Sequence, residues 1–151
     1  PLAVNTQSNA GNRGFNTISR YPHPQFVCLN GSEVSLELRR RHLTLEELVP
    51  QLRERTSAQR AMITGGPNGL ICCDTDGAIQ HIPAFADSVR DRVGAGDALF
   101  AVTSLLFALG APPDVSGFFG NLAGAAAVAQ LGNESPLSSQ DLSRHAAVLM
   151  K

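Results

Sequence analysis

The sequence predicts an α/β fold in which a mostly parallel sheet is flanked by helices and includes one β-hairpin. Two observations predict this class. Short apolar runs without polar alternation recur through the first half of the chain, as in strands that are buried on both faces of a sheet. Segments of helical length with recognisable caps lie between and after these runs. For a chain of 151 residues this order predicts one domain, residues 1–151, with a sizeable core.

The apolar runs come in a definite order along the chain. They predict strands over residues 2–6, 26–29 and 61–64. Two further runs, at residues 70–73 and 78–82, flank the sequence Asp-Thr-Asp-Gly, whose Asp-Gly pair is a strong hairpin signal. Between the first two runs, residues 7–14 are rich in Asn, Ser and Gly and are predicted to form a loop.

Helices are predicted from their caps and their apolar spacing. Ser32 is expected to cap a helix that runs to about Arg41. Thr44 and Glu47 form a capping box for a helix to about Arg55. The last third is predicted to be helical, with one helix over residues 95–109, a second capped by Asp114 and running to about Leu131, and a third capped by Ser138 or Ser139 and running to about Met150.

Composition excludes several classes of function. The net charge is −1, so a role on nucleic acid or on an anionic membrane has no electrostatic support. No apolar run approaches the roughly 20 residues of a membrane span, and the first residues do not have the layout of a signal peptide, which predicts a cytoplasmic protein. The absence of an initiator Met suggests a piece of a longer chain. The three cysteines, Cys28, Cys72 and Cys73, are expected to be small buried hydrophobes rather than a disulfide framework.

The most informative stretch is Asp-Arg-Val-Gly-Ala-Gly-Asp at residues 91–97, between an extended segment and a helix. Small residues leave the first backbone amides of the helix uncovered at the positive end of its dipole, which is a site for an anion. Asp97 lies in the first turn, where a carboxylate could take a proton from an attacking hydroxyl. The alternative is that Asp97 only favours the helix N-terminus and the glycines only allow tight packing.

Three segments, taken together, resemble one family. Residues 91–97 resemble the C-terminal signature of the ribokinase, or PfkB, family of carbohydrate kinases. Asn30-Gly31-Ser32-Glu33 is similar to its Asn-x-x-Glu motif, and residues 64–69, Thr-Gly-Gly-Pro-Asn-Gly, are similar to its Thr-x-Gly-x-x-Gly nucleotide loop. Asn121 lies where the family often has an Asn beside adenine. The resemblance implies a ribokinase-like fold, of which this chain would be the nucleotide-binding C-terminal half.

The resemblance also implies roles for individual residues. Asp97 would be the general base, and the amides of Gly94, Ala95 and Gly96, with that of Asp97, would form the anion hole for the transferring phosphoryl group. Asp91 would help to hold a monovalent cation such as K⁺ behind the hole; the alternative is a structural Asp that fixes the loop. The family commonly has Thr or Ser where this chain has Arg92. That change would disturb the cation site or bring a guanidinium to a phosphate.

The implied nucleotide site has three parts. Asn30 and Glu33 would position Mg²⁺ and the phosphates of ATP, with Glu33 acting through metal-bound water. Thr64, Gly66 and Gly69 would border the nucleotide, and Asn121 would face adenine. The alternatives are an ordinary acid in a helix first turn for Glu33, a plain strand-to-loop turn for residues 64–69, and a helix–helix hydrogen bond for Asn121.

The sequence therefore predicts an ATP-dependent, Mg²⁺-requiring kinase of a sugar or sugar phosphate, with a nucleotide and a sugar as partners. Residues 91–94 and the opening Val-Asn-Thr-Gln at residues 4–7 are similar to family members fused to a sugar-nucleotide transferase, such as heptose-phosphate kinases. Asn5 and Gln7 would face the acceptor sugar or stabilise the loop.

One alternative to this kinase is a truncated, inactive fragment that binds nucleotide or self-associates as a homodimer through an exposed sheet edge. Another is a small-molecule binder that reuses the fold without a nucleotide.

Overall fold

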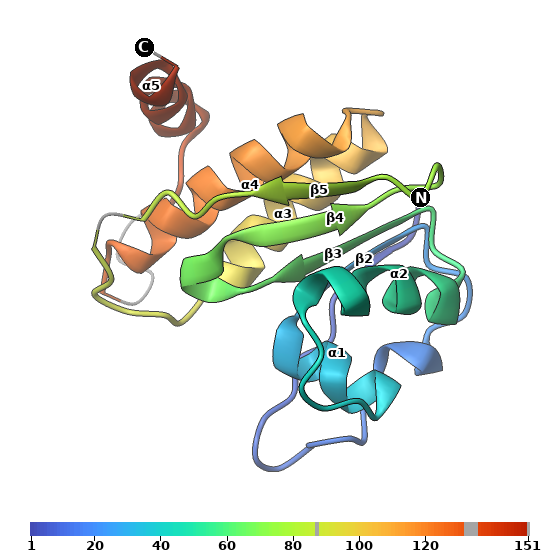
Figure 1. Cartoon of the computed structure of the whole chain (residues 1–151). Helices are drawn as coiled ribbons and strands as arrows, with labels where there is room; N and C mark the ends of the chain where they lie inside the picture. The colour runs from blue at the N-terminus through green and yellow to red at the C-terminus, as the bar shows by residue number, and fades with distance from the viewer. Residues whose placement is uncertain (87, 132–135, 151) are drawn as a thin grey trace. The chain divides into compact units, whose positions relative to one another are not determined.

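The structure, a computed structural model, describes residues 1–86, 88–131 and 136–150 (Figure 1). The chain forms two compact units, Pro1–His81 and Ile82–Lys151. The expectation of one domain over residues 1–151 stays a prediction.

The first unit is built on a five-stranded sheet whose order follows the chain. Its strands are β1 (Ala3–Val4), β2 (Phe26–Asn30), β3 (Arg60–Thr64), β4 (Leu70–Cys73) and β5 (Ile79–Ile82). The pairs β1–β2 and β2–β3 are parallel, whereas β3–β4 is antiparallel, so the sheet is mixed. The predicted hairpin is confirmed, because β4 and β5 are neighbours in the sheet and the Gly77 N–H donates to the Asp74 carbonyl at 3.0 Å. The first strand is shorter than predicted.

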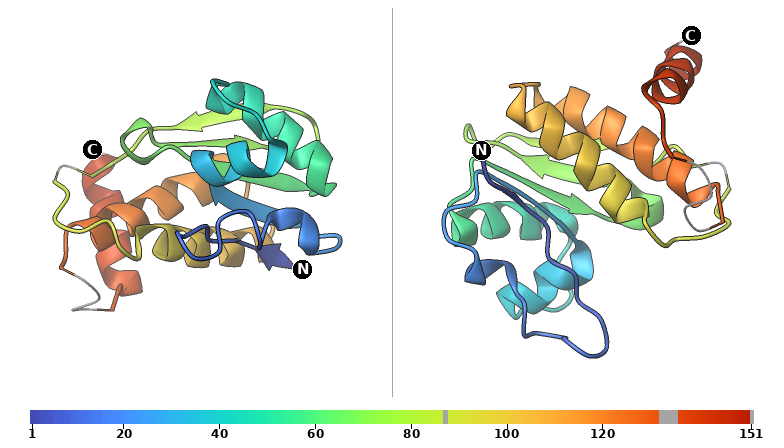
Figure 2. Two further views of the ribbon diagram at one scale, coloured as in Figure 1. Left: turned by 90° about the horizontal axis from the view of Figure 1, so that it is seen from below. Right: turned by 180° about the vertical axis from the view of Figure 1, so that it is seen from behind.

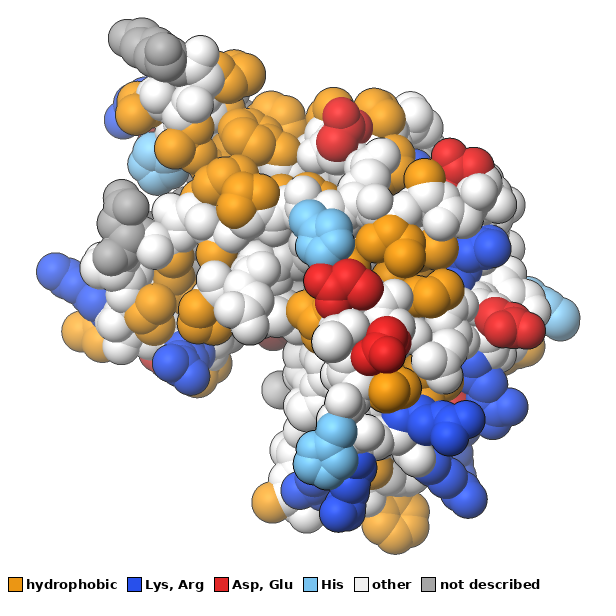
Figure 3. All heavy atoms as spheres, viewed as in Figure 1, with side chains coloured by type: hydrophobic (Ala, Val, Ile, Leu, Met, Phe, Trp, Pro, Cys, Tyr) orange, Lys and Arg blue, Asp and Glu red, His pale blue; other side chains and the backbone are white. Residues whose placement is uncertain are grey.

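Two helices pack on one face of this sheet. They are α1 (Gly31–Leu38) and α2 (Leu45–Thr56), and charged side chains gather on their outer surface (Figure 3). The Thr44–Glu47 capping box of α2 is confirmed. The predicted cap at Ser32 is wrong: Asn30 caps α1, because its side chain accepts from the Glu33 N–H. The helix also ends before Arg41, since Arg39 takes a left-handed φ of 53°.

The buried residues of β2, β3 and β4 alternate between the two faces of the sheet. On the helix side, strand residues pack with Leu48, Val49 and Leu52 of α2; they include Val27, Leu29, Ile63, Ile71 and Cys73. The three cysteines are free and buried, as expected from the sequence. Burial raises the pKa of Cys28 and of Cys72 to about 12, so both thiols stay protonated at neutral pH.

The described residues of the second unit form the helices α3 (Ala95–Ala108), α4 (Pro113–Val128) and α5 (Ser139–Leu149). α3 and α4 run alongside each other (Figure 2). Gly120 permits this approach, because an added Cβ there would collide with Cγ2 of the fully buried Thr103. Ser138 caps α5, one of the two predicted caps. The predicted cap at Asp114 is wrong, since Pro112 occupies the cap and α4 ends at Val128, before Leu131.

Candidate active site

The start of α3 is open to a ligand. Gly94 precedes the helix with a φ of 81°, a conformation that favours glycine, and among the residues that the structure describes no side chain caps the helix. The Ala98 N–H makes an intrahelical bond to the Gly94 carbonyl at 2.9 Å. The earlier amides, those of Ala95, Gly96 and Asp97, lie in the first turn, where helical N–H groups lack an intrahelical acceptor. These amides therefore form an electropositive end to the helix.

The side chains around this helix start leave it accessible. A Cβ built on Gly96 would meet nothing within 4 Å. Asp97 is exposed, and within the described residues its carboxylate has no hydrogen-bond or ion-pair partner. An unengaged carboxylate beside a row of amides has the arrangement that general-base catalysis at an anion site requires.

Asp91 holds the loop that leads into α3. Its Oδ1 accepts a hydrogen bond from the Val93 N–H at 3.0 Å. Its own N–H donates to the carbonyl of Val128, the last residue of α4, at 3.2 Å. These contacts agree with the loop-fixing alternative for Asp91, while its role toward a cation stays a prediction. Arg92, next along the chain, is exposed.

In the first unit, the first residues of two motifs lie side by side. Asn30 and Thr64 are register partners at the carboxyl ends of the parallel strands β2 and β3. Glu33 follows one turn later in a reciprocal cap: Asn30 Oδ1 accepts from the Glu33 N–H at 2.9 Å, and Glu33 Oε2 accepts from the Asn30 N–H at 3.0 Å. The sheet and this cap place one amide, one hydroxyl and one carboxylate at the same edge.

The glycine loop after β3 is a tight turn. The Gly65 N–H donates to the Gly69 carbonyl at 2.7 Å, and the Gly69 N–H donates to the Gly66 carbonyl at 3.0 Å. Gly66 and Gly69 have φ values of +59° and +80°, which residues other than glycine rarely adopt. A Cβ on Gly66 would meet nothing within 4 Å, so the backbone there is open to a ligand.

Asn121 is buried in the second unit. Its Nδ2 donates to the carbonyls of Ile82 at 3.2 Å and Pro83 at 2.8 Å. The alternative of a helix–helix hydrogen bond is therefore wrong, because the partner is the backbone at and just after the end of β5. The side chain ties α4 to that segment.

The predicted residues fall into two groups by unit. The first unit holds Asn30, Glu33, Thr64, Gly66 and Gly69, and the second unit holds Asp91, Gly94, Ala95, Gly96, Asp97 and Asn121. Sequence analysis missed two contributors. The Ser8 N–H donates to Glu33 Oε1 at 3.0 Å. Leu45 packs against the glycine loop, since a Cβ on Gly65 would lie 2.8 Å from its Cδ1. A backbone donor such as Ser8 leaves no signal in a sequence.

The donor set limits what metal this site could hold. Within the described part of the chain, no group of three or more His, Cys, Asp or Glu side chains could hold a metal ion. Mg²⁺ needs no such cage, because it is usually bound by one or two carboxylates together with water and substrate phosphates. The half-buried carboxylate of Glu33 beside Asn30 fits that mode.

Over the same described ranges, no helix has the length and apolar character needed to cross a membrane.

Comparisons with known proteins identify one family and one fold. The family model described as "pfkB family carbohydrate kinase" matches residues 8–140. "Bifunctional protein HldE" of Rhodopseudomonas palustris is 31% identical over 109 residues, which cover 70% of this chain and 22% of that protein. Phosphofructokinase-2 from Escherichia coli in complex with potassium aligns with a TM-score of 0.76 and 22% identity, over 88% of this chain and 43% of that one. Ribokinase from Thermotoga maritima aligns with a TM-score of 0.70 and 21% identity, over 85% and 43%.

The structural matches show a ribokinase-like fold, as the resemblance in the motifs implied. The chain spans less than half the length of each of these proteins. Because the family model covers most of its residues, the chain belongs to the pfkB family of carbohydrate kinases.

Proposed function

We propose that this chain is the nucleotide-binding C-terminal half of an ATP-dependent kinase that phosphorylates a hydroxyl of a sugar or sugar phosphate. The observation that carries the proposal is the uncapped start of α3, with the unengaged carboxylate of Asp97 in its first turn. The resemblance of residues 4–7 and 91–94 to heptose-phosphate kinases favours a phosphorylated sugar as the acceptor.

The helix start would stabilise the transferring phosphoryl group. Amides of Gly94, Ala95, Gly96 and Asp97 would donate to its oxygens, and such preorganised donors are often the largest contribution to catalysis. Asp97 would accept the proton of the acceptor hydroxyl as that oxygen attacks the γ-phosphorus of ATP, whose bond to the bridging β-phosphate oxygen breaks and releases ADP. The open space at Gly96 supports this arrangement, because a phosphate must approach the backbone closely there.

The first unit would hold the nucleotide and its metal. Mg²⁺, which neutralises phosphate charge when bound, would be held by Glu33 through water and positioned with help from Asn30. Thr64, Gly66 and Gly69 would border the nucleotide, where the open backbone of Gly66 allows close approach. The side-chain amide of Asn121 already donates to two backbone carbonyls. Asn121 would therefore shape the part of the site that holds adenine and would not contact adenine itself.

The proposal also includes a binding site for a monovalent cation. One structural neighbour, phosphofructokinase-2 of Escherichia coli, has been crystallised with potassium. Asp91 would contribute to an equivalent K⁺ site while it also holds the loop before Gly94. The exposed guanidinium of Arg92, next to it, is the feature that argues for a weaker cation requirement in this chain.

Titration of the chain with ATP and Mg²⁺ tests the proposal. Binding measured by calorimetry, together with a higher melting temperature, is the expected result, and Gly96→Val is expected to weaken the binding and to reduce the rise in melting temperature. No effect of Mg·ATP on the wild type would overturn the proposal and favour a binder that does not use nucleotide. ATP binding without turnover on any sugar would identify an inactive fragment, and size-exclusion chromatography would then show whether it forms a homodimer.

A further inference from the structure

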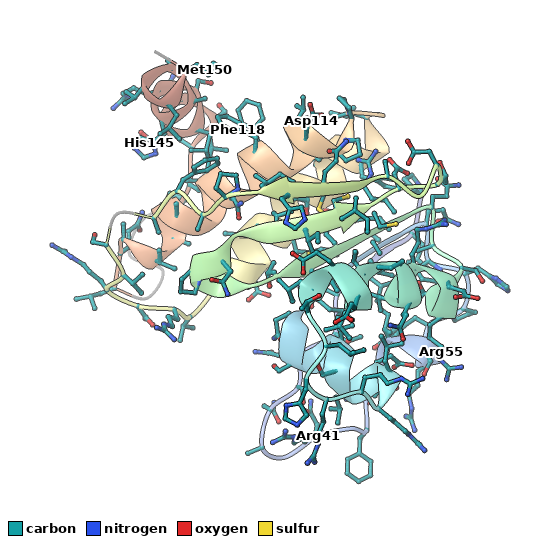
Figure 4. The ribbon with its side chains drawn as sticks, in the orientation of Figure 1. Arg41, Arg55, Asp114, Phe118, His145 and Met150 are labelled. Atoms are coloured by element: carbon teal, nitrogen blue, oxygen red, sulfur yellow. The ribbon has the colours of Figure 1, made fainter. Side chains whose placement is uncertain are left out.

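Two carboxylates of α1 hold the segment between β1 and β2. Glu33 and Glu37 lie one turn apart, so their side chains project from the same side of the helix. The Ser8 N–H donates to Glu33 Oε1 at 3.0 Å, and the Ser19 N–H donates to Glu37 Oε2 at 3.4 Å. Glu37 also accepts from Arg55 Nε at 3.3 Å. Arg55, which α2 carries, is labelled in Figure 4. Both ends of the intervening loop are therefore tied to α1.

The loop itself is held by its own asparagines. We call residues 7–16 the asparagine loop. Asn9 Oδ1 accepts from the Gly11 and Asn12 N–H groups, each at 3.1 Å. In return, Asn12 Oδ1 accepts from the Asn9 N–H at 2.8 Å, and its Nδ2 donates to the Gln7 carbonyl at 3.4 Å. These bonds flank Ser8 on both sides, so its N–H is presented to α1 from an ordered turn.

Glu33 is oriented by two backbone donors from different parts of the chain. Oε1 receives the Ser8 N–H, and Oε2 receives the Asn30 N–H at 3.0 Å. A cavity of about 10 Å³ lies between the asparagine loop and α1, with Glu33 in its wall, and it has room for about one water molecule. On that side the carboxylate has little freedom to turn. Ser8 is thus part of what sets the direction of the Glu33 oxygens.

We propose that the backbone N–H of Ser8 positions the Glu33 carboxylate for Mg²⁺, so that the asparagine loop supports metal-dependent nucleotide binding. The inference rests on the proposed function, which assigns Glu33 to the metal. Groups that hydrogen-bond a metal ligand fix its orientation, and their loss typically lowers metal affinity by about 10–100-fold. The Ser8 side chain is not needed for this role, since the donor belongs to the backbone.

Proline at position 8 tests the idea, because it removes the N–H, whereas alanine keeps it. ATP binding is measured by calorimetry at increasing Mg²⁺ concentrations for the wild type, Ser8→Pro and Ser8→Ala. We expect Ser8→Pro to raise the half-maximal Mg²⁺ concentration by about tenfold and Ser8→Ala to leave it unchanged. Binding of ATP in EDTA is expected to be the same in all three, since Ser8 acts through the metal ligand.

The outcomes separate this inference from the proposed function. If the wild type binds ATP in a Mg²⁺-dependent way but Ser8→Pro and Ser8→Ala behave alike, the role of Ser8 is wrong and the kinase proposal stands. If the wild type shows no Mg²⁺-dependent binding, the kinase proposal fails and the role of Ser8 fails with it. If Ser8→Pro does not fold, hydrogen exchange of the Ser8 backbone N–H in the wild type tests the inference instead. Exchange about tenfold slower with Mg·ATP than with ATP in EDTA would support it, and equal exchange rates would overturn it.

Discussion

Asn30 and Thr64 are register partners across the parallel strands β2 and β3, so the first residues of two nucleotide motifs share one edge of the sheet. The two residues are 34 positions apart in the chain. Parallel pairing makes the carboxyl ends of both strands coincide, and ligands of open α/β sheets bind outside those ends. This pairing supports assigning both motifs to one nucleotide.

Removal of the proposed base tests the chemistry of the α3 start. In the full-length kinase of which this chain is the proposed half, Asp97→Asn is expected to lower turnover by about 10²–10⁴-fold, because general-base catalysis contributes about that much, while ATP affinity stays close to the wild type. Asp114→Asn is a matched control, since Asp114 is also an exposed acid in the first turn of a helix. Steady-state kinetics and calorimetry on both variants make the comparison. Wild-type turnover in Asp97→Asn would contradict the assignment.

Gly96→Val tests whether phosphate approaches the backbone there. The new side chain would project into open space, and valine has a somewhat higher helix propensity than glycine, so we expect the free energy of unfolding to change by less than about 1 kcal/mol. ATP affinity is expected to fall by more than about tenfold, because the side chain occupies the place of the phosphoryl oxygens. Ala101→Val, at an exposed position of the same helix, is the control. Equal ATP affinity in the two variants would argue against the anion hole.

Two glycines of α4 are expected to respond to alanine with opposite signs. Gly120→Ala would force a Cβ into Thr103 and near Leu99 Cγ, at 3.3 Å, and should destabilise the protein by about 1–3 kcal/mol. At Gly124 the closest atom to a new Cβ is the Ala95 carbonyl oxygen at 3.5 Å, an ordinary contact. Gly124→Ala should therefore gain up to about 1 kcal/mol from helix propensity. Urea unfolding of both variants checks the sign, and equal destabilisation would refute the packing argument.

Glu37 is expected to make stability depend on acidic pH. Burial alone raises the pKa of its carboxyl, but hydrogen bonds from Thr17, Ser19 and Arg55 outweigh burial and hold the pKa below its ordinary value of 4.5. The unfolded chain then binds the proton more readily, so the stabilisation is complete above about pH 4.5 and is lost as the pH falls through the lower, folded value. Glu37→Gln should remove this part of the pH dependence. Urea unfolding of both proteins at a series of pH values gives the comparison, and parallel curves would contradict the role of Glu37.

The buried thiols are expected to be unreactive in the folded protein. With a pKa of about 12, Cys28 and Cys72 each carry about one thiolate in ten thousand at pH 8. Iodoacetamide should therefore label the native chain very slowly and all three cysteines rapidly in urea. Ala10→Cys, which adds an exposed thiol in the asparagine loop, is expected to be labelled at once and provides the positive control. Rapid labelling of native wild-type protein would show that the sheet opens.

The sequence by itself determined the features that depend on near neighbours in the chain. The Thr44–Glu47 cap, the Asp-Gly hairpin and the uncapped glycine entry to α3 each involve residues within a few positions of one another. Local rules also failed where two short polar residues competed. Ser32 was expected to cap α1, but Asn30 at the end of β2 has the extended backbone that a cap requires.

The tertiary structure alone decided the contacts between distant segments. Ser8 reaches Glu33 across 25 positions, and Asn121 reaches Ile82 across 39. Each joins a side chain to a backbone group. Every residue carries the same backbone carbonyl and every residue except proline the same N–H, so no pattern of residue types reveals the pair. Sequence motifs therefore nominate the residues that we propose to face a phosphate and a metal. The groups that orient these residues depend on how the loop folds back onto α1 and on the bonds of Asn121 to the Ile82 and Pro83 carbonyls.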